Sequence, residues 1–296
     1  MSRPVRVLAI YVLICLAMVS AATQLSAAER LLLGTTTSTA DSGLLDAILP
    51  GFEDRFGVDV EVLAVGTGQA LEMGRRGDVD VLLVHARTLE DAFVEEGYAT
   101  VRYDVMYNDF VIVGPLADPA SLTGLALAAD AFLRLSKGEG LFASRGDDSG
   151  TNIKERQLWT DAGLSPGVQD EWYVSLGQGM AATLVYANEA GAYALTDRGT
   201  FLARSEVLPD LQVVVGGGTI DQNEDQDLRN SYGILPLNQE RFPWVNANAA
   251  SAFVAWLTSV EIQAAIARFG LEQYGQPLFY PSSAEWQARE ESTGDE

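Results

Sequence analysis

The segment LLLGTTTST at residues 31–39 decides the fold of this chain. Its three leucines form a short apolar run typical of a buried strand, and the hydroxyl residues after Gly34 form a polar loop. The order strand, polar loop, helix is the building unit of an α/β sheet. The helix is expected because apolar residues recur at the spacing of one helix face, at Leu44, Leu45, Ile48, Leu49 and Phe52.

The same unit repeats along the chain. Residues 58–65 and 79–84 have the composition of strands, and each is followed by a helical pattern, which predicts a parallel α/β sheet in this part. Residues 232–235 form a strand that can return to this unit, before two closing helices and a charged tail at 285–296 that we expect to be frayed. Between them we expect a second α/β unit, with strands at 109–115, 141–144 and 192–195 and helices at 122–135, 151–162 and 180–189.

Charge and composition exclude several classes of partner. The 296 residues include 19 Lys plus Arg against 41 Asp plus Glu, a formal net charge of -22. This sign opposes binding to a phosphate backbone, so we expect no nucleic-acid partner. One cysteine, Cys15, and one histidine, His85, are too few for a Cys/His zinc site of about four ligands or for an internal disulfide. We therefore expect neither a protein-bound metal nor a cofactor.

Residues 1–28 have the pattern of a secretory signal peptide. Arg3 and Arg6 precede an apolar run, and Ser26 and Ala28 occupy the positions that a signal peptidase favours before a cut. A membrane anchor is the alternative, but the run at residues 7–19 is shorter than the ~20 residues that span a bilayer. We expect cleavage before Glu29 and an exported, periplasmic protein.

Four loops that lead into expected helices consist of small hydrogen-bond donors. The first turn of a helix has unpaired N–H groups and a partial positive charge, so Gly, Ser and Thr there allow donors to converge on an anion. In an open α/β sheet such loops lie at the carboxyl ends of strands, where ligands bind. Ordinary helix capping is the alternative for any single loop. The four loops are TTTS (35–38), GTG (66–68), SGT (149–151) and GQG (177–179).

Arg145 is the candidate cation of this site. It stands between an expected strand and the loop of Ser149 and Thr151. A guanidinium group offers several donors to a tetrahedral oxyanion and keeps its charge at every relevant pH. The alternative is a salt bridge to Asp147 or Asp148. None of the loops has the glycine spacing of a nucleotide site.

Taken in order, these motifs resemble those of the tungstate-binding proteins of ABC transporters. The likeness covers most of the chain after residue 28. It departs from the family after Ser-Gly-Thr, where the family usually has histidine and this chain has Asn152. The motifs that carry the likeness are TTTSTADSGL (35–44), GTGQAL (66–71), GDVDV (77–81), MYNDF (106–110), SRGDDSGT (144–151), GQGM (177–180) and LTDRGT (195–200).

The resemblance implies a two-lobed α/β periplasmic binding protein, of the class shared with molybdate and phosphate receptors, with the oxyanion in the cleft between the lobes. Residues 29–113 and 231–296 would form one lobe and residues 114–230 the other. It also implies a monomer without catalytic residues that passes tungstate, bound as an oxyanion, to an ABC permease. The ligand contacts it implies are Thr35, Thr36, Thr37, Ser38, Thr67, Arg145, Ser149 and Thr151.

Three alternatives stay open on the sequence. The listed donors suit any tetrahedral oxyanion, so molybdate, sulfate or phosphate is an alternative ligand. An exported hydrolase would use Ser149 or Thr36 as nucleophile and His85 as base, although a structural role is more typical of a lone histidine at a strand end. A ligand-sensing module that docks on a signalling partner is the third.

Overall fold

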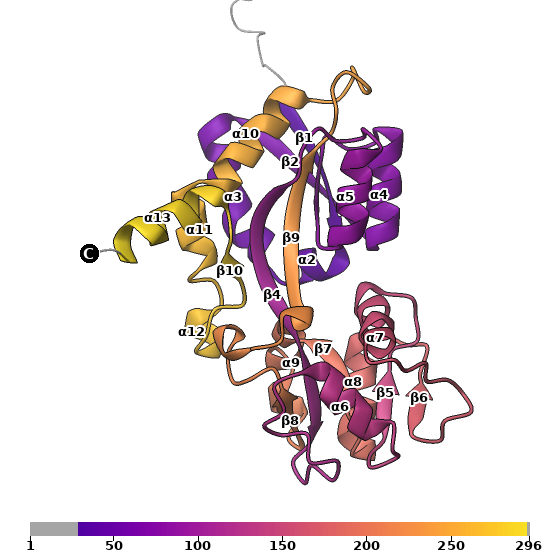
Figure 1. Ribbon diagram of the computed structural model, residues 1–296. Helices are drawn as coiled ribbons and strands as arrows, with labels where there is room; N and C mark the ends of the chain where they lie inside the picture. Colours follow the sequence, from indigo (N-terminus) through magenta and orange to yellow (C-terminus); the bar gives the residue numbers. More distant parts are fainter. Residues whose placement is uncertain (1–28, 295–296) are drawn as a thin grey trace, which may run out of the picture.

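The structure, a computed structural model, describes residues 29–294 and shows two α/β lobes joined by two long strands (Figure 1). The expected signal peptide, residues 1–28, lies outside the described residues. Among the described residues, no single helix is long and apolar enough to cross a membrane. Only Ala247–Thr258 and Val260–Tyr274, taken together, have the length and composition of a membrane span, and they are bent by 62° to each other.

The first lobe confirms the alternation read from the sequence. Its strands β1 (Glu29–Thr36), β2 (Val58–Val65) and β3 (Val81–Val84) are parallel, with β1 in the middle, and β3 pairs antiparallel with β9 (Arg229–Pro236). The strand at 232–235 thus does return to the first unit. The helices of this part are α2 (Thr37–Asp41), α3 (Leu44–Phe56), α4 (Thr67–Arg76) and α5 (Arg87–Glu95).

Strand β4 (Tyr103–Pro115) belongs to both lobes. From Tyr103 to Asp109 it pairs with β9, and from Phe110 onward it pairs with β7 (Ala194–Asp197) and β8 (Leu211–Val215). Figure 1 shows β4 and β9 side by side between the lobes. The lobe boundaries expected at 113/114 and 230/231 stay a prediction, because both strands continue across them.

The second lobe is built around the far half of β4. Its remaining elements are α6 (Ala128–Leu135), β5 (Phe142–Ser144), α7 (Gly150–Asp161), β6 (Tyr173–Ser175), α8 (Met180–Ala190), α9 (Arg198–Leu202) and three 3-10 turns, Ser205–Val207, Ile220–Gln222 and Gln226–Leu228. The helix expected at 122–135 begins only at Ala128, because the Asp118 carboxylate accepts hydrogen bonds from the N–H groups of Leu122 and Thr123 and holds a turn there.

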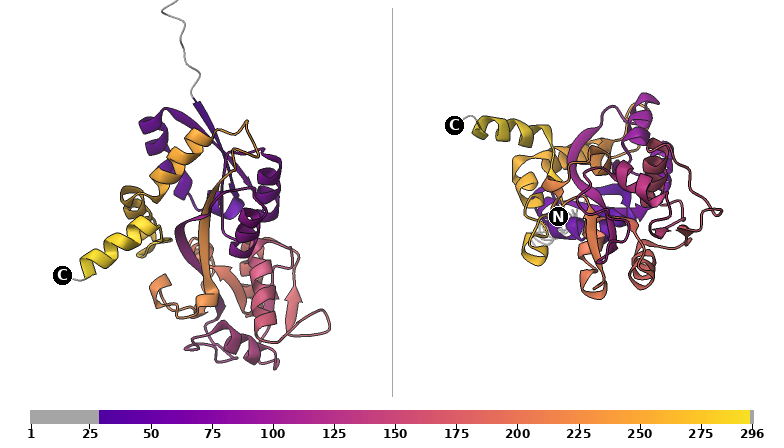
Figure 2. Two further views of the ribbon diagram at one scale, coloured as in Figure 1. Left: turned by 45° about the horizontal axis from the view of Figure 1, so that its top comes forward. Right: turned by 60° about the horizontal axis from the view of Figure 1, so that its bottom comes forward.

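The end of the chain returns to the first lobe. Its elements are α10 (Ala247–Thr258), α11 (Val260–Ile266), α12 (Leu271–Tyr274), β10 (Tyr280–Pro281) and α13 (Ala284–Gly294), and β10 pairs with β4. The expectation of a frayed tail was wrong, because α13 is a helix that projects from the body (Figure 2). Its start is fixed by Ser283, whose hydroxyl accepts a hydrogen bond from the N–H of Trp286.

Each lobe has its own core. In the first lobe Phe52 packs edge-on against Phe253 with ring centroids 5.0 Å apart, and in the second the Trp159 ring stacks on Phe132 at 3.8 Å. The buried side chains of β4 divide between them, since Val105 and Met106 lie in the first core and Phe110 and Ile112 in the second. Each lobe has a further buried cluster on the opposite face of its sheet, with Leu82 in the first lobe and Val111 in the second, and the loops between the lobes remain available for a site.

Candidate anion-binding site

The threonine-rich loop at the end of β1 divides its hydroxyl groups between the fold and the solvent. Thr35 is 0% exposed, and its Oγ1 donates to the carbonyl oxygen of Leu83 at 2.7 Å. Thr36 is 3% exposed and caps α2, accepting a hydrogen bond from the N–H of Thr39. Thr37 and Ser38, in the first turn of α2, are exposed. Thr35 and Thr36 therefore fix the shape of the loop, whereas Thr37 and Ser38 are exposed and Ser38 Oγ lies 3.2 Å from Thr36 Oγ1.

His85 lies directly behind this loop, at the end of β3. Its Nε2 is 3.1 Å from Thr36 Oγ1 and 3.3 Å from Ser38 Oγ, and its Nδ1 is 3.0 Å from Asn230 Oδ1. The ring stacks on Tyr232 with centroids 4.6 Å apart. Asn230 and Tyr232 belong to β9, so the histidine connects the threonine loop to a strand shared by both lobes.

Burial lowers the pKa of His85, against the opposing effects of its hydrogen bond to Asn230 and of the charge on Asp197. The ring is therefore neutral at physiological pH in the absence of a nearby anion.

The loop before α7, residues 145–149, carries the charges. Arg145 is 18% exposed at its side chain, and its Nη2 and Nε lie 2.6 and 3.2 Å from Asp147 Oδ2. Partial burial of Asp147 acts against it, but hydrogen bonds from Ser149 and Arg145 lower the pKa of this carboxyl. Ser149 caps α7 by accepting from the N–H of Asn152, and Thr151, half-buried, follows in the first turn. The salt bridge that the sequence offered as an alternative is thus formed.

The start of α7 meets the first lobe. A Cβ atom placed on Gly150 would lie 3.9 Å from His85 Cε1 and 4.0 Å from Thr67 Oγ1. Thr67 opens α4 and belongs to the predicted loop at 66–68. Figure 1 shows α2 and α7 on the edges at which the two lobes face each other. The structure therefore brings Thr36, Ser38, Thr67 and the α7 start together around His85.

The loop at 177–179 lies against the loop before α7. The N–H of Gln178 donates to the carbonyl oxygen of Arg145 at 3.0 Å. Gly146, at a φ of 60°, has no room for a side chain because a Cβ there would collide with Ser175 Oγ. This packing supports the backbone of Arg145 from the side of α8.

Asn152 points into the second lobe. Its Nδ2 donates to Ser144 Oγ at 3.2 Å, and its Oδ1 accepts from the N–H of Asp148 at 3.2 Å. The same pocket holds the buried carboxylate of Glu155, which accepts hydrogen bonds from Ser144 and Tyr173. Asn152 thus stabilises the loop of Arg145 from behind.

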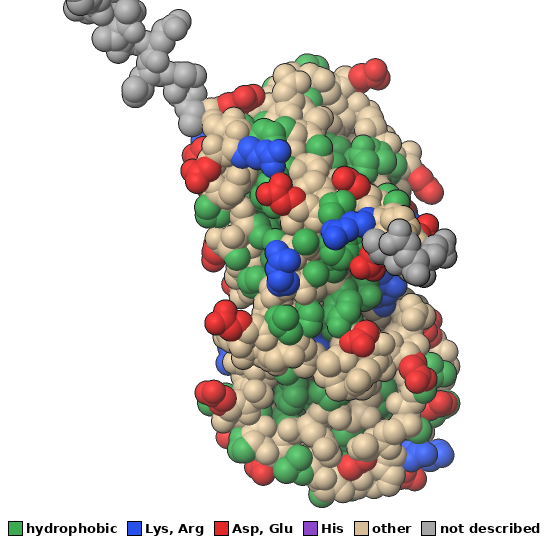
Figure 3. All heavy atoms as spheres, turned by 90° about the vertical axis from the view of Figure 1, so that its left-hand side faces the viewer, with side chains coloured by type: hydrophobic (Ala, Val, Ile, Leu, Met, Phe, Trp, Pro, Cys, Tyr) green, Lys and Arg blue, Asp and Glu red, His purple; other side chains and the backbone are tan. Residues whose placement is uncertain are grey.

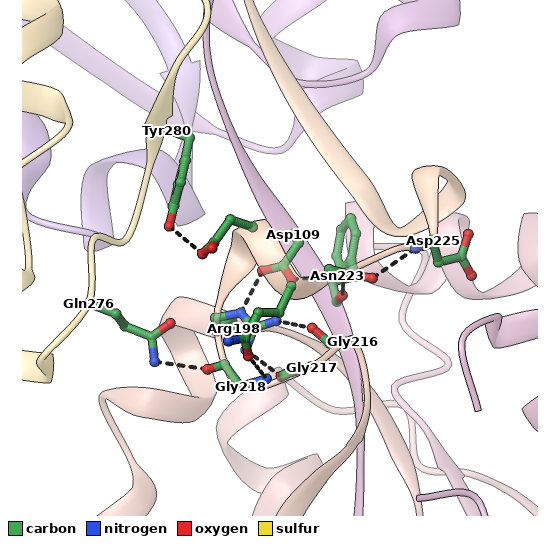
Figure 4. Close-up of polar contacts among 12 residues, drawn as sticks. Asp109, Arg198, Gly216, Gly217, Gly218, Asn223, Asp225, Gln276 and Tyr280 are labelled. Carbon is green, nitrogen blue, oxygen red and sulfur yellow. Dashed lines mark hydrogen bonds and ion pairs between the residues drawn. The ribbon is translucent and has the colours of Figure 1, made fainter. Parts of the chain in front are cut away.

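The crossing strands hold two polar pairs that sequence reasoning missed. Asn230 Nδ2 donates to Asn108 Oδ1 at 2.7 Å, which joins β9 to β4 beside His85. Where β4 changes partners, Arg198 holds Asp109 through two hydrogen bonds of 2.6 and 2.9 Å, with both side chains 2% exposed. Figure 4 shows Arg198 between Asp109 and the carbonyl groups of Gly216 and Gly217. The motifs MYNDF and LTDRGT contain Asn108, Asp109 and Arg198 and were the available signal, whereas Asn230 lies in neither motif.

Donors from helix starts and one arginine suit a dianion, because fixed dipoles can replace its hydration. The surface gives little long-range help: on the face in Figure 3, acidic side chains are spread over both lobes, and the net charge of the chain is -22. Two lobes on shared strands, with donor loops facing each other, define the class of bilobal solute-binding proteins.

Comparisons with known proteins agree with this class. A model of the PBP superfamily domain matches residues 20–261. A Haloferax volcanii protein named an ABC transporter anion-binding protein is 47% identical over 86% of this chain and 72% of its own length. The tungstate-binding protein TupA of Peptoclostridium acidaminophilum is 45% identical over 86% of each chain. The structure of the tungstate-binding protein TupA from Desulfovibrio alaskensis is 42% identical, covers 86% of this chain and 100% of its own, and superposes with a TM-score of 0.77. The chain therefore belongs to the PBP superfamily and, within it, to the family of the TupA proteins.

Proposed function

We propose that this protein binds the tungstate oxyanion outside the cytoplasm and delivers it to an ABC permease. The observation that carries this proposal is the meeting of donor loops from both lobes at His85, where Gly150 of α7 approaches Thr67 of α4. The relatives named tungstate-binding proteins support the choice of ligand, and the Haloferax relative supports the link to an ABC transporter.

We divide the eight candidate residues by role. Thr35 and Thr36 shape the loop, because their hydroxyl groups are engaged with Leu83 and with the start of α2. The other six offer hydrogen bonds to the anion, and Arg145 adds the positive charge. These donors are Thr37, Ser38, Thr67, Arg145, Ser149 and Thr151.

The remaining parts of the proposal follow the class of protein. A mature monomer, exported by the predicted signal peptide, closes its lobes on the ligand, and closure is what the permease recognises. Binding and release involve no reaction, so the protein is not an enzyme. Molybdate is the strongest competitor, since the same donors suit any tetrahedral oxyanion.

One arrangement speaks for the hydrolase alternative. Thr36, His85 and Asn230 follow one another within hydrogen-bond distance, in the order of a nucleophile, a base and an orienting amide. The Thr36 hydroxyl, however, caps α2 and is buried, and the relatives are named as binding proteins. The histidine is better explained as part of the binding site.

Isothermal titration of the ligand-stripped mature protein tests the proposal, with tungstate, molybdate, sulfate and phosphate in one buffer. We expect tight binding of tungstate and no binding heat from sulfate or phosphate. Binding of sulfate or phosphate in preference to tungstate would reassign the ligand. Heat from none of the four would overturn the receptor function.

A further inference from the structure

The hydrogen bonds of His85 determine which ring nitrogen carries a proton. The amide nitrogen of Asn230 donates to Asn108 Oδ1 at 2.7 Å, so the amide oxygen of Asn230 faces His85 Nδ1 at 3.0 Å. An amide oxygen can only accept, and Nδ1 must therefore be the donor. In the neutral ring the proton lies on Nδ1, and Nε2 presents a lone pair to the threonine loop.

A neutral Nε2 competes with an anion for the same hydrogens. It lies 3.1 Å from Thr36 Oγ1 and 3.3 Å from Ser38 Oγ, so it accepts a hydrogen bond from one of these hydroxyl groups. That hydrogen then points toward the ring and is lost to a ligand in the cleft. Thr36 has little freedom to compensate, because its Oγ1 also accepts from the N–H of Thr39 and lies 2.6 Å from Thr39 Oγ1.

Protonation of Nε2 reverses this hydrogen bond. The ring then donates to the hydroxyl oxygen, and the hydroxyl hydrogen becomes available to the ligand. The imidazolium also places a positive charge behind a loop whose own side chains are neutral, which stabilises a dianion in a poorly solvated site.

The surroundings of His85 contain the groups such a charge requires. Tyr232 of β9 stacks on the ring, and a cation on an aromatic face is stabilised. The carboxylate of Asp197, at the start of α9, attracts the protonated form. From the other side the ring faces the start of α7 at Gly150. Other charged groups on these elements are mostly paired with one another: Arg145 with Asp147 and Arg156 with Asp148 around the start of α7, Glu90 with Arg102 behind Ala86, Arg87 with Asp91 in α5, and Asp109 with Arg198 where β4 changes partners.

We propose that binding of a fully deprotonated oxyanion is coupled to the uptake of one proton from solvent by His85 Nε2, which releases a loop hydroxyl for the ligand. This inference rests on the proposed function of the site. Affinity then falls as the pH rises, by up to about tenfold per pH unit, between the pKa of His85 in the free protein and its higher pKa in the complex. Outside that interval the affinity is independent of this group.

Nitrogen-15 NMR of the imidazole gives a direct test. His85 is the one histidine of the sequence, so its ring signals need no assignment by mutation. We expect the Nδ1–H tautomer in the ligand-stripped protein at neutral pH and the imidazolium after saturation with tungstate. An Nε2–H tautomer in the free protein, or a ring that stays neutral in the saturated protein, would overturn the inference.

Calorimetry counts the protons. Titrating tungstate at one neutral pH in two buffers of different ionisation enthalpy gives the number of protons taken up, which we expect to be between zero and one for the wild type. In His85→Gln the uptake should vanish and the dissociation constant should lose its pH dependence, because an amide donates without titrating. Asn230→Asp should instead move the pH profile upward, since a carboxylate at Nδ1 favours the imidazolium.

The outcomes separate the two proposals. Tungstate binding without proton uptake in the wild type overturns the coupling and leaves the receptor function intact. No binding of any oxyanion overturns both. If His85→Gln fails to fold, the ring signals and proton count of the wild type decide the matter alone.

Discussion

The two principal donor loops of the site are built in opposite ways. The loop at 35–38 has neutral side chains, two of them buried, and is held by Leu83, Thr39 and His85. The loop at 145–151 is charged and more exposed, and its backbone is left-handed at Gly146 and Asp148, with φ of 60° and 56°. Its arginine is engaged with a carboxylate of the same loop.

Because of this difference, the two loops would have to exchange different hydrogen bonds in order to bind an anion. The first loop needs only to turn a hydroxyl hydrogen, so its donors are nearly in place. The second must exchange the Arg145–Asp147 pair for contacts with the ligand, which lowers the net gain from the arginine. We infer that, in the proposed site, the first loop gives selectivity for shape and the second gives recognition of charge.

The largest effect is expected from removing the charge of the second loop. Arg145→Ala should weaken tungstate binding about 100-fold, because a hydrogen bond to a charged group contributes up to about 3 kcal/mol. The fold should be preserved, since the side chain is partly exposed and its ion pair is local. Titration calorimetry and thermal unfolding measure both quantities, with Arg145→Lys as the matched control of intermediate affinity. An unchanged dissociation constant in the folded variant would remove Arg145 from the site.

Two isosteric substitutions test the division within the first loop. Thr35→Val should reduce the free energy of unfolding by about 1–3 kcal/mol, because it leaves the buried carbonyl oxygen of Leu83 without its partner. Thr37→Val should change stability by less than about 0.5 kcal/mol and weaken tungstate binding several-fold. Denaturant unfolding and calorimetry on both variants check this. The reverse pattern would mean that Thr35 holds the ligand and Thr37 does not.

A substitution at Asp147 tests the competition within the second loop, because it should leave Arg145 free for the ligand. Asp147→Asn removes the anion that competes with tungstate for Arg145, and it should tighten binding by a few-fold. The comparison is with Asp148→Asn, whose carboxylate pairs with Arg156 on the surface and should leave affinity unchanged. Equal effects of the two variants would point to net charge rather than to the specific competition.

The smallest effect concerns stability and pH. Burial lowers the pKa of His85 in the folded protein below its ordinary 6.5, so its contribution to stability is present above 6.5 and is lost as the pH falls toward the lower folded value. The slope is at most about 1.4 kcal/mol per pH unit for one proton. Denaturant unfolding of the wild type and of His85→Gln, measured from pH 6.5 downward, isolates the contribution of His85, because the carboxylates titrate alike in both proteins. Parallel stability curves would show that His85 is not buried in its neutral form.

The sequence was sufficient for the local elements of this molecule. The strand and the helix around residues 31–52 follow a short-range pattern and are found, but the residues expected as a loop between them form the end of β1 and the short helix α2. The donor loops were also visible, because Gly, Ser and Thr before an apolar period mark a helix start. The helix at 122–135 was read too long because periodicity does not show that Asp118 captures the first N–H groups.

The roles of the individual site residues could not be predicted from the sequence, because they depend on contacts between residues far apart in the chain. The five consecutive hydroxyl residues 35–39 look alike in sequence, and only the packed structure separates the buried Thr35, Thr36 and Thr39 from the exposed Thr37 and Ser38. The partners of His85 and Asp109 lie 145 and 89 residues away, at Asn230 and Arg198. Pairings of this length leave no periodic signal in one sequence.

Strand β4 has a consequence for the way the chain assembles. Its first half hydrogen-bonds to β9, which begins only at Arg229, and its second half to β7 and β8. Neither sheet can be completed while the ribosome is still making the middle of the chain, because residues that lie side by side are made far apart in time. Pairings between residues so far apart in sequence form slowly, so the strands shared by the two lobes become ordered only after β9 has been made.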